Sequence, residues 1–313
     1  MRVLVTGGAG FLGAHLCEAL LARGEEVVAI DNFATSSGAV VERLTGYTGF
    51  TFVEGDVCAG PQVTGAFDAI AHLACPASPD EYLRLPLETL AIGSHGSEFV
   101  LSLAKKNNCR VLLASTSEVY GDPLERPQRE EYWGNVNPIG PRSVYDESKR
   151  YAEALFMAHR RARGVNTGIV RIFNTYGPGL RPSDGRVVSN FVAQALRGEP
   201  LTIYGDGRQT RSFCYVADLI DGLQHMLISN ETGPINLGNP NEISIIELAE
   251  TILSLTGSNS TMEFRPAPQD DPMTRRPDIA KATALLGWVP TVPLVEGLAQ
   301  TISWQRSLAP AQV

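Results

Sequence analysis

The chain has 313 residues, 43% of them hydrophobic and 19% charged, and its 26 Lys and Arg against 34 Asp and Glu give a net charge of −8. This composition is typical of one large globular domain or two of ordinary size; it excludes a disordered chain, and the acidic balance argues against a nucleic-acid partner. Five cysteines without a CxxC pair, and no apolar stretch near 18 residues, predict a cytoplasmic protein with no disulfide framework, no metal and no membrane span.

The first half of the chain alternates short apolar strands with helix-length segments. Residues 3–5 predict a buried strand, and apolar residues at helical spacing from Leu12 to Leu20 predict a helix that ends at Gly24. Parallel strands joined by helices are covered on both faces, so the alternation predicts an α/β fold with a doubly wound parallel sheet of Rossmann type. Further strands are expected at 27–30, 51–53, 67–73, 110–114 and 167–171, and helix-length segments near 84–107 and 143–163.

The sequence after Tyr176 is richer in turn residues, beginning with Gly177, Pro178 and Gly179. We therefore expect a Rossmann domain at 1–176, with later segments at about 213–240 rejoining it, and a smaller lobe made mainly of 177–313. In the second part we expect a helix at 187–197, a strand at 201–204, helices at 244–256, 278–286 and 294–306, and a frayed tail at 308–313.

Three glycines lie between the first expected strand and the first helix. Gly7, Gly10 and Gly13 form a GxxGxxG pattern, in which the missing side chains let backbone amides approach a pyrophosphate at the positive end of a helix. Asp31 ends the next strand, where a carboxylate can accept a hydrogen bond from a ribose 2′-hydroxyl. The combination predicts a dinucleotide site, and it favours NAD over NADP because Asp31 would repel a 2′-phosphate.

Single residues of this site also allow other interpretations. Asp31 could cap the turn at Asn32, and Asp56 with Val57 could form a plain turn rather than contact adenine. The predicted cofactor-binding residues are Gly7, Gly10, Phe11, Leu12, Gly13, Asp31, Asn32, Asp56, Val57, Leu73 and Ala74, together with Tyr145 and Lys149.

Tyr145 and Lys149 stand one helical turn apart in the 143–163 segment and so share one face of the expected helix. A lysine ammonium at this spacing can lower the pKa of the phenol and hold a nicotinamide ribose. Thr116, Ser117 and Glu118 follow the 110–114 strand at its carboxyl end, where open α/β sheets bind their ligands. Together with the glycine pattern, these residues resemble the extended short-chain dehydrogenase/reductase superfamily.

This resemblance implies a catalytic role for three of these residues. It implies that Tyr145 is the base acting on a sugar hydroxyl, that Lys149 assists, and that Thr116 shares the hydrogen bond of the transferred proton. From the residues alone, Thr116 could be a strand-end residue that satisfies a backbone group, and Tyr145 could be a core aromatic of an amphipathic helix.

Seven blocks, spread over nearly the whole chain, carry a narrower resemblance. They are residues 72–78, 115–123, 132–138, 171–178, 184–190, 204–213 and 270–278. These blocks resemble the UDP-glucuronate decarboxylases, a family that forms UDP-xylose. The resemblance implies that C4 of the glucuronate ring is oxidised, that the resulting β-keto acid loses carbon dioxide, and that the 4-keto pentose is then reduced, so NAD stays bound and acts catalytically.

The same resemblance implies roles beside the substrate carboxylate. Ser117 and Glu118 would face C5 and the departing carboxylate, with Glu118 able to help protonate C5, and Arg275 would bring a cation from the second lobe. From the residues alone, Glu118 could be a solvated loop carboxylate, and Arg275 an ion-pair partner of the aspartates around it. Arg275 and Arg276 are adjacent, so the sequence leaves open which one is the active-site cation.

The resemblance also implies a binding surface for the UDP-sugar and a homodimer formed through helices on the core surface. Arg211 is a natural partner for a diphosphate, whereas Asn174 could be a turn residue and Tyr204 an edge-strand aromatic. The predicted substrate-binding residues are Ala77, Ser78, Tyr82, Asn174, Arg186, Val187, Val188, Tyr204, Gln209, Arg211 and Arg275.

Two further classes of function stay open. A nucleotide-sugar 4,6-dehydratase would want an Asp-Glu pair where this chain has Ser117 and Glu118, and a 4-epimerase needs neither Glu118 nor Arg275. A non-catalytic nucleotide-sensing module of the same fold predicts a broken Tyr/Lys pair, whereas Tyr145 and Lys149 are both present.

Three positions depart from the family pattern. Gly93 stands where an Asn is usual, Ser36 where a glycine is common, and Cys75 where a serine is common. Gly93 should cost its helix about 1 kcal/mol relative to Ala, and His95 is expected on the helix surface rather than in the space at position 93. From these departures we expect weaker cofactor retention, with some UDP-4-keto-xylose and NADH released.

Overall fold

The structure is a computed structural model that describes residues 1–61, 63–182, 184–267, 272 and 274–308. Its central strands are β1 (Arg2–Thr6), β2 (Glu26–Asp31), β3 (Phe50–Glu54), β4 (Ala69–His72), β5 (Arg110–Thr116), β6 (Thr167–Ile172) and β11 (Ile235–Leu237). Within these described ranges they form one parallel sheet in the order β11-β6-β5-β4-β1-β2-β3. The strand order reverses between β1 and β4, so the predicted doubly wound sheet of Rossmann type is confirmed.

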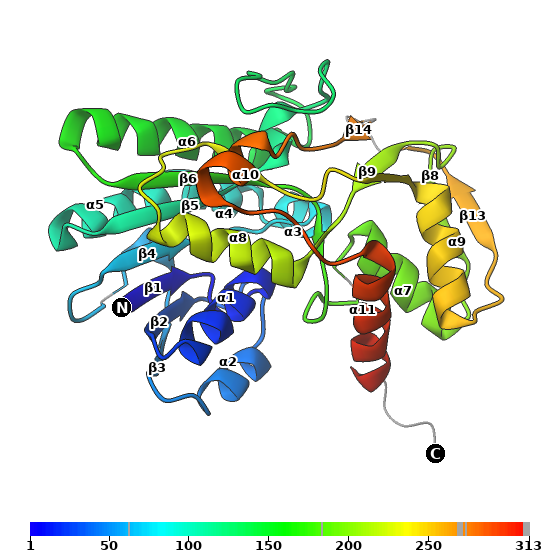
Figure 1. The fold of residues 1–313 in the computed structure, drawn as a ribbon, viewed down its shortest axis with the longest axis horizontal. Helices are drawn as coiled ribbons and strands as arrows, with labels where there is room; N and C mark the ends of the chain where they lie inside the picture. The colour runs from blue at the N-terminus through cyan, green and yellow to red at the C-terminus, as the bar shows by residue number, and fades with distance from the viewer. Residues whose placement is uncertain (62, 183, 268–271, 273, 309–313) are drawn as a thin grey trace.

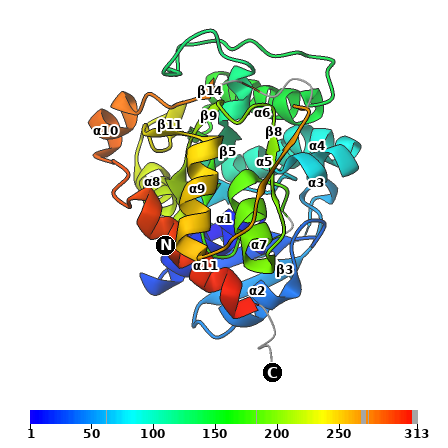
Figure 2. The ribbon, with the colours of Figure 1, turned by 90° about the vertical axis from the view of Figure 1, so that its right-hand side faces the viewer.

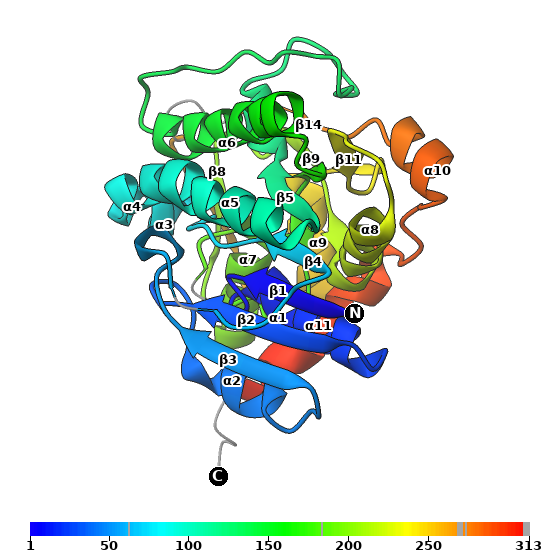
Figure 3. The ribbon, with the colours of Figure 1, turned by 90° about the vertical axis from the view of Figure 1, so that its left-hand side faces the viewer.

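Helices cover both faces of this sheet, as an all-parallel sheet requires. One face carries α1 (Phe11–Ala22) and α8 (Val216–Ile228), the other carries α5 (Ser97–Asn107) and α6 (Ser143–Arg163), and α2 (Gly38–Leu44) precedes β3. Figure 3 shows α5 and α6 side by side on their face. No helix among the described residues is long and apolar enough to cross a membrane.

The two faces have separate hydrophobic cores because successive side chains of a strand point to opposite faces. Val3 and Val5 of β1 belong to the core that includes residues of α1 and α8, whereas Leu4 between them belongs to the core that includes residues of α5 and α6. All three side chains are fully buried. The continuous apolar run at residues 3–5 therefore contributes side chains to both cores, as expected for a strand in the centre of the sheet.

The helix-length segment expected before β5 is helical from Pro86 to Asn107, with a π-helical turn within it. Pro86 starts a new helix at its first position, where the missing N–H is tolerated, and a π-helical turn at Ile92–Gly96 leads directly into α5. Gly93 in this turn lies so close to α6 that a Cβ there would be 2.6 Å from the carbonyl oxygen of Ser148. The two short helices in front of this turn are α3 (Pro79–Arg84) and α4 (Pro86–Ala91).

The later part of the chain adds a smaller lobe at the right of Figure 1, and Figure 2 shows α7, α9 and α11 together in it. The helices and the strand expected for this part are present, with ends shifted by at most two residues. The expected tail lies, from residue 309 onward, outside the described residues. The remaining elements are β7 (Thr175–Tyr176), α7 (Val187–Arg197), β8 (Leu201–Tyr204), β9 (Thr210–Ser212), β10 (Cys214–Tyr215), β12 (Glu242–Ser244), α9 (Ile245–Thr256), β13 (Met262–Arg265), β14 (Thr274–Arg275), α10 (Ala280–Leu286) and α11 (Leu294–Leu308). Of these, α10 lies outside the smaller lobe and packs against α8 and β11.

Some elements of the sheet domain had no predicted counterpart, among them α2, α8 and β11. Helix α8 and strand β11 lie within the segment that was expected to rejoin the first domain. Strand β11 pairs in parallel with β6, with Ile235 opposite Val170. At three residues, β11 is too short to stand out from the loops around it in the sequence.

Candidate active site

A cavity of about 1330 Å³ lies at the carboxyl ends of the central strands and extends along the second lobe. It includes the point where β1 and β4 diverge, which is where doubly wound sheets bind their ligands. Every residue predicted to bind cofactor or substrate, or to act in catalysis, lines this cavity. The fold thus brings residues from the first turn of the chain together with Arg211 and Arg275 from the second lobe.

The glycine-rich turn has no room for side chains. Gly7 has a φ of +71° and lies so close to the β4 side that a Cβ would be 2.8 Å from the backbone of Ala74. A Cβ at Gly13 would be 2.0 Å from the carbonyl oxygen of Gly7. Gly10 caps α1 without a side-chain hydrogen bond, so the first amides of the helix face the cavity. This cradle fits a dinucleotide pyrophosphate.

Asp31 is held in place by three donors around the end of β2. One of its carboxylate oxygens accepts a hydrogen bond from the amide of Ala9 at 3.1 Å. The other accepts from the amide of Phe33 at 2.9 Å and from the hydroxyl of Ser36 at 2.8 Å. Asp31 therefore caps its own turn and also lines the cavity, and the oxygen that accepts from Ala9 keeps acceptor capacity for a ribose hydroxyl.

Tyr145 lies in the first turn of α6 and is 6% exposed. Its ring stacks on that of Tyr82 with centroids 5.1 Å apart, and its hydroxyl is hydrogen-bonded to Thr116. Burial raises the pKa of the Tyr145 phenol, and the nearby Cys75 adds to the rise, while the bond to Thr116 opposes it. Burial thus raises the pKa of the phenol on balance, and the lowering of this pKa by Lys149 stays a prediction.

Lys149 is buried behind the tyrosine. Its ammonium donates a hydrogen bond to the carbonyl oxygen of Ala114 at 2.9 Å and lies 5.8 Å from the centre of the Tyr145 ring. Burial, with the charge of Lys149, lowers the pKa of His72 to about 3, so this histidine is neutral and hydrogen-bonds to the hydroxyl of Thr6 at 2.8 Å. The ammonium is fixed by β5, which prepares it to bind a cofactor hydroxyl.

Glu118 lies in the short 3₁₀ turn Ser117–Tyr120 that follows β5. Its amide donates to the hydroxyl of Thr116 at 3.2 Å, which orients the turn. One oxygen of its carboxylate accepts hydrogen bonds from Arg142 at 2.6 Å and from Arg275 at 2.9 Å. Burial would raise the pKa of Glu118, but these guanidinium groups lower it to about 2. Glu118 is thus an ion-paired carboxylate inside the cavity and not a solvated loop residue.

The cation at this end of the cavity is Arg275. Its side chain is 1% exposed, and it donates to the carbonyl oxygen of Gly121 at 2.5 Å as well as to Glu118. The side chain of Arg276 is 42% exposed and lies 3.8 Å from Glu242, outside the cavity lining. Of the two adjacent arginines, it is therefore Arg275 that lines the cavity.

Several charged residues at the site were not predicted. Arg142 caps α6 three residues before Tyr145, and Asp146 is buried directly after it, with one carboxylate oxygen that has no hydrogen-bond partner. Burial and the charge of Glu118 raise the pKa of Asp146 to about 7. The position of Arg142 beside the Tyr145 motif was the available signal, but spacing along the chain does not show that it faces Glu118.

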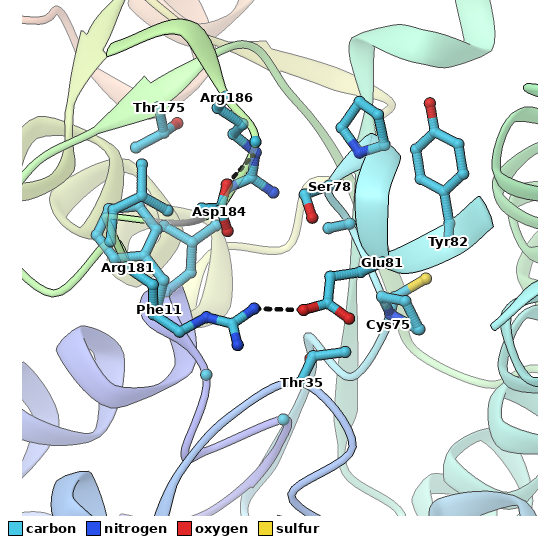
Figure 4. Close-up of a pocket in the computed structure, with 18 of the residues that line it drawn as sticks. Phe11, Thr35, Cys75, Ser78, Glu81, Tyr82, Thr175, Arg181, Asp184 and Arg186 are labelled. Atoms are coloured by element: carbon cyan, nitrogen blue, oxygen red, sulfur yellow. Dashed lines mark hydrogen bonds and ion pairs between the residues drawn. The ribbon is translucent and has the colours of Figure 1, made fainter. Parts of the chain in front are cut away.

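Two ion pairs lie at the rim of the cavity, one between the two lobes and one within the second lobe, as Figure 4 shows. Arg181 of the second lobe donates to Glu81 of α3 at 2.5 Å, and Arg186 lies 3.4 Å from Asp184. Ser78 and Tyr82 face the same space from the sheet domain. Neither Arg181 nor its acidic partner was predicted. The predicted Arg186 is held by an acid of its own loop.

The departures from the family pattern have local structural reasons. Cys75 is close to Lys149 at the cavity, and burial raises the pKa of its thiol. The hydroxyl of Ser148 occupies the space that a Cβ at Gly93 would need and donates to the carbonyl oxygen of Thr89 at 2.7 Å. His95 is exposed, as expected, and does not fill that space.

Comparison with known proteins places the chain among nucleotide-sugar enzymes. The family model described as NAD dependent epimerase/dehydratase family matches residues 3–238. UDP-glucuronic acid decarboxylase 1 from Danio rerio is 52% identical over 303 residues, which cover 97% of this chain and 72% of that protein. UDP-glucuronic acid decarboxylase 1 from Arabidopsis thaliana is 51% identical over 303 residues, covering 97% of this chain and 69% of that protein.

Two solved structures share the fold over nearly the full length. A UDP-glucose 4-epimerase from Thermotoga maritima with UDP-glucose has a TM-score of 0.90 at 26% identity and covers 98% of this chain and 99% of that one. A UDP-glucuronic acid 4-epimerase from Bacillus cereus in complex with UDP-glucuronic acid and NAD has a TM-score of 0.88 at 29% identity, covering 99% and 100%. Both ligand sets are of the kind that the cavity was expected to bind.

Proposed function

Because the chain belongs to the NAD dependent epimerase/dehydratase family, we propose that it uses NAD to convert UDP-glucuronate through a UDP-4-keto intermediate into UDP-xylose and carbon dioxide. The observation that carries this proposal is the buried pair of Arg275 and Glu118 in the same cavity as Tyr145 and Lys149. The decarboxylases that are about half identical to this chain support it. A 4-epimerase would need no such pair, and a 4,6-dehydratase would require an aspartate at the position of Ser117.

The cavity holds NAD by its glycine turn and its carboxylate at β2. Gly7 and Gly13 let the backbone approach the pyrophosphate, the amide end of α1 stabilises its charge, and Asp31 accepts from the adenosine ribose. NAD bound there would supply the oxidant for C4 of the sugar and the reductant for the 4-keto pentose, so it would not be consumed. Asp56 and Val57, which also line the cavity, would contact the adenine.

Tyr145 removes the proton of the C4 hydroxyl. Thr116 hydrogen-bonds to the phenol and orients it, and this bond also favours the phenolate. Lys149, fixed on Ala114, supplies positive charge beside the ring and holds the nicotinamide ribose. Because burial raises the pKa of the phenol, formation of the phenolate depends on Thr116 and Lys149. Substitution of either residue should slow the oxidation at C4.

Decarboxylation follows from the keto group at C4, because the carboxylate on C5 is then that of a β-keto acid and an enolate takes the electrons of the broken C–C bond. Arg275 binds the carboxylate through its planar guanidinium. Glu118 beside it disfavours a second anion and so favours its loss as neutral carbon dioxide. The enolate takes one proton at C5, so each turnover consumes one proton.

Release of labelled carbon dioxide from UDP-glucuronate tests this proposal directly. Purified enzyme with NAD is incubated with UDP-glucuronate labelled at C6; released ¹³CO₂ and UDP-xylose, identified by mass and NMR, are the expected products. Tyr145→Phe is the control, and unimpaired turnover in that variant would remove Tyr145 from its role. Formation of UDP-galacturonate without carbon dioxide would instead show a 4-epimerase.

Release of the intermediate belongs to the same proposal. Gly93 supplies no side-chain amide near the cofactor, so we infer that some UDP-4-keto-xylose and NADH leave before the second hydride transfer. The absorbance of NADH during turnover measures this release. A flat trace with only UDP-xylose formed would contradict the inference and leave the decarboxylation itself untouched.

We propose a cytoplasmic homodimer whose subunits meet through α3, α4 and α6. Leu83, Leu87 and Leu90 are 41% to 74% exposed on α3 and α4, and Tyr151 is 53% exposed on the neighbouring α6. An apolar surface of this kind supports burial against a second copy. Light scattering coupled to size exclusion should give twice the chain mass, and Leu87→Lys should reduce the measured mass.

The proposed cytoplasmic location is supported by the cysteines. All five lie in the described part of the chain as free thiols, in keeping with a reducing compartment.

We further propose that the structural units divide at residue 176. The sheet domain consists of residues 1–176 and a later segment at about 213–240, which contains α8 and β11, and the rest of 177–313 forms the substrate lobe. Limited proteolysis with and without UDP should cut first in the connections between these two units.

A further inference from the structure

The segment that carries Arg275 belongs to the smaller lobe, but the sheet domain holds the residues that follow it. Strand β14 pairs with β9 of its own lobe, with Arg275 opposite Arg211. Residues 276–278 instead pair with Gln128, which lies in the connection between β5 and α6. The position of the cation at the cavity therefore depends on a contact between the two lobes.

Gln128 is fully buried, and its main chain and its side chain both take part in this contact. Its amide donates to the carbonyl oxygen of Arg276 at 2.8 Å, and its carbonyl oxygen accepts from the amide of Asp278 at 2.9 Å. Its side-chain oxygen accepts from the amide of Arg276 at 2.7 Å, and its side-chain amide donates to the carbonyl oxygen of Glu125 at 2.7 Å. The residue directly after Arg275 is thus bonded to Gln128 at both its amide and its carbonyl group.

Asn236 ties this contact to the central sheet. It lies in β11, is fully buried, and its side-chain amide donates to the carbonyl oxygens of Gln128 and Asp278 at 3.0 Å each. Its side-chain oxygen accepts from the hydroxyl of Tyr120 at 2.8 Å, and Tyr120 ends the turn that carries Glu118. One buried network therefore joins the segment after β14 to the central sheet and to the turn of Glu118.

The guanidinium of Arg275 reaches the cavity from this fixed backbone. It donates to the carboxylate of Glu118 and to the carbonyl oxygen of Gly121. A planar guanidinium binds a carboxylate through two parallel hydrogen bonds only when its position and its orientation are both correct. Because Gln128 holds the backbone one residue beyond Arg275, a change of the Gln128 side chain should displace this guanidinium without removing any group that touches the substrate.

We propose that Gln128 positions Arg275 for the carboxylate of the substrate, by holding the backbone amide of Arg276 against the sheet domain. Gln128 is a positioning residue in this assignment, because it lies outside the cavity lining and acts through Arg275. The inference rests on the proposed function, since it names how that site keeps its carboxylate-binding cation in place.

The test compares a sugar that has a carboxylate on C5 with one that has a hydroxymethyl group there. In a Tyr145→Phe background loaded with NAD, calorimetry measures the affinities of UDP-glucuronate and UDP-glucose at fixed salt and pH. Gln128→Met keeps the size of the side chain but removes its hydrogen bonds. It should weaken UDP-glucuronate about three- to tenfold, the range for one neutral hydrogen bond, and UDP-glucose by less than about twofold.

A double-mutant cycle shows whether Gln128 acts through Arg275. Arg275→Met alone should weaken UDP-glucuronate about 10- to 100-fold, the range for a charge-assisted hydrogen bond. Adding Gln128→Met to Arg275→Met should then change this affinity by less than about twofold. Gln128→Asn keeps a polar group at the buried position and tests the same contact if the methionine variant does not fold. Its shorter side chain should weaken UDP-glucuronate in the same selective way.

Asn107→Leu is the matched control, because the side chain of Asn107 makes the same two kinds of hydrogen bond elsewhere. It accepts from the amide of Phe67 at 3.1 Å and donates to the carbonyl oxygen of Leu103 at 2.8 Å. None of these three residues lines the cavity, so this variant should lower Tm but change neither affinity.

Three results would overturn the proposal. Equal weakening of both ligands by Gln128→Met, or additive effects of Gln128→Met and Arg275→Met, would show a merely structural role for Gln128. Unchanged affinities would show no role. Carbon dioxide release by the unmodified enzyme is scored separately, so a failure of the proposed function is distinguished from a failure of this inference.

Discussion

Replacing Gly93 by alanine should destabilise the protein, although helix propensity predicts the reverse. Gly93 is buried in the π-helical turn between α4 and α5. A Cβ at this position would be 2.2 Å from the hydroxyl oxygen of Ser148 and 2.6 Å from its carbonyl oxygen. The hydroxyl can rotate away, but the carbonyl belongs to the backbone of α6, so the two helices must separate.

The size of the effect follows from three contributions. Overpacking of this kind costs about 1 to 3 kcal/mol, and displacement of the Ser148 hydroxyl from the carbonyl oxygen of Thr89 costs about 1 kcal/mol more. The gain in helix propensity from Gly to Ala is about 1 kcal/mol. The free energy of unfolding should therefore fall by roughly 2 kcal/mol. At an unfolding entropy of about 2.1 cal/mol/K per residue, this corresponds to a drop in Tm of about 3 °C for a chain of 313 residues.

Calorimetric unfolding of matched variants measures this difference. Gly38→Ala is the control, because Gly38 lies at the start of α2 with nothing within 4 Å of an added Cβ, and it should raise Tm slightly. A double-mutant cycle adds Ser148→Ala, which should cost less in the Gly93→Ala background than alone, since the hydroxyl is already displaced there.

Two results would refute this reasoning. If Gly93→Ala raised Tm as Gly38→Ala does, the close approach of the π-helical turn to α6 would be wrong. If the Gly93→Ala and Ser148→Ala effects simply added, the loss would not come from their contact. Because Ser148 precedes Lys149, the same variants also show whether separation of these helices increases the release of NADH.

Three further substitutions test charges and contacts near the cavity. The pKa of Asp146 is about 7 in the folded protein and 3.8 in the unfolded chain, so the wild type loses stability as the pH rises through this window. Asp146→Asn removes this loss: in urea unfolding, the free energy of unfolding should rise by up to about 4 kcal/mol at pH 8 and by little near pH 4. Ser36→Ala removes one donor to Asp31 and should raise the dissociation constant of NAD about three- to tenfold in equilibrium dialysis, and an unchanged constant would contradict this role. Arg276→Met should leave the rate of carbon dioxide release within about twofold, because its side chain lies outside the cavity lining, whereas a large loss would reopen the choice between the adjacent arginines.

The elements that the sequence predicted are those whose pattern is local. The helix at Ser143–Arg163 has the expected ends because its apolar stripe is regular and Gly164 follows in the left-handed conformation that ends a helix. The segment before β5 is helical from Pro86 to Asn107, as expected, but the π-helical turn within it could not be predicted because it depends on packing: Gly93 shows its reason only once α6 is placed against it. Strand β11 exists as a strand because β6 is beside it.

The site shows the same boundary between local pattern and tertiary contact. Tyr145 and Lys149 could be paired from helical spacing, and the glycine turn from its position between strand and helix. The pKa of Tyr145 could not be predicted, because burial depends on Tyr82 and the cavity walls. Arg142 could not be found either, since 24 residues of chain separate it from Glu118 and only the fold joins them.

The net charge of −8 acquires a different meaning at the site. An acidic protein repels an anionic UDP-sugar at long range, so recognition depends on where its cations lie and not on their number. Arg186 and Arg181 each have an acidic partner, Asp184 and Glu81, which fixes these side chains in advance and reduces the entropy lost on binding, but it also cancels much of their charge. At Glu118, two guanidinium groups share one carboxylate oxygen, so a single acid holds Arg142 and Arg275 at the same end of the cavity. These cavity-lining cations of an acidic protein are thus placed by acidic side chains, and this arrangement, not the net charge, decides what an anionic ligand meets there.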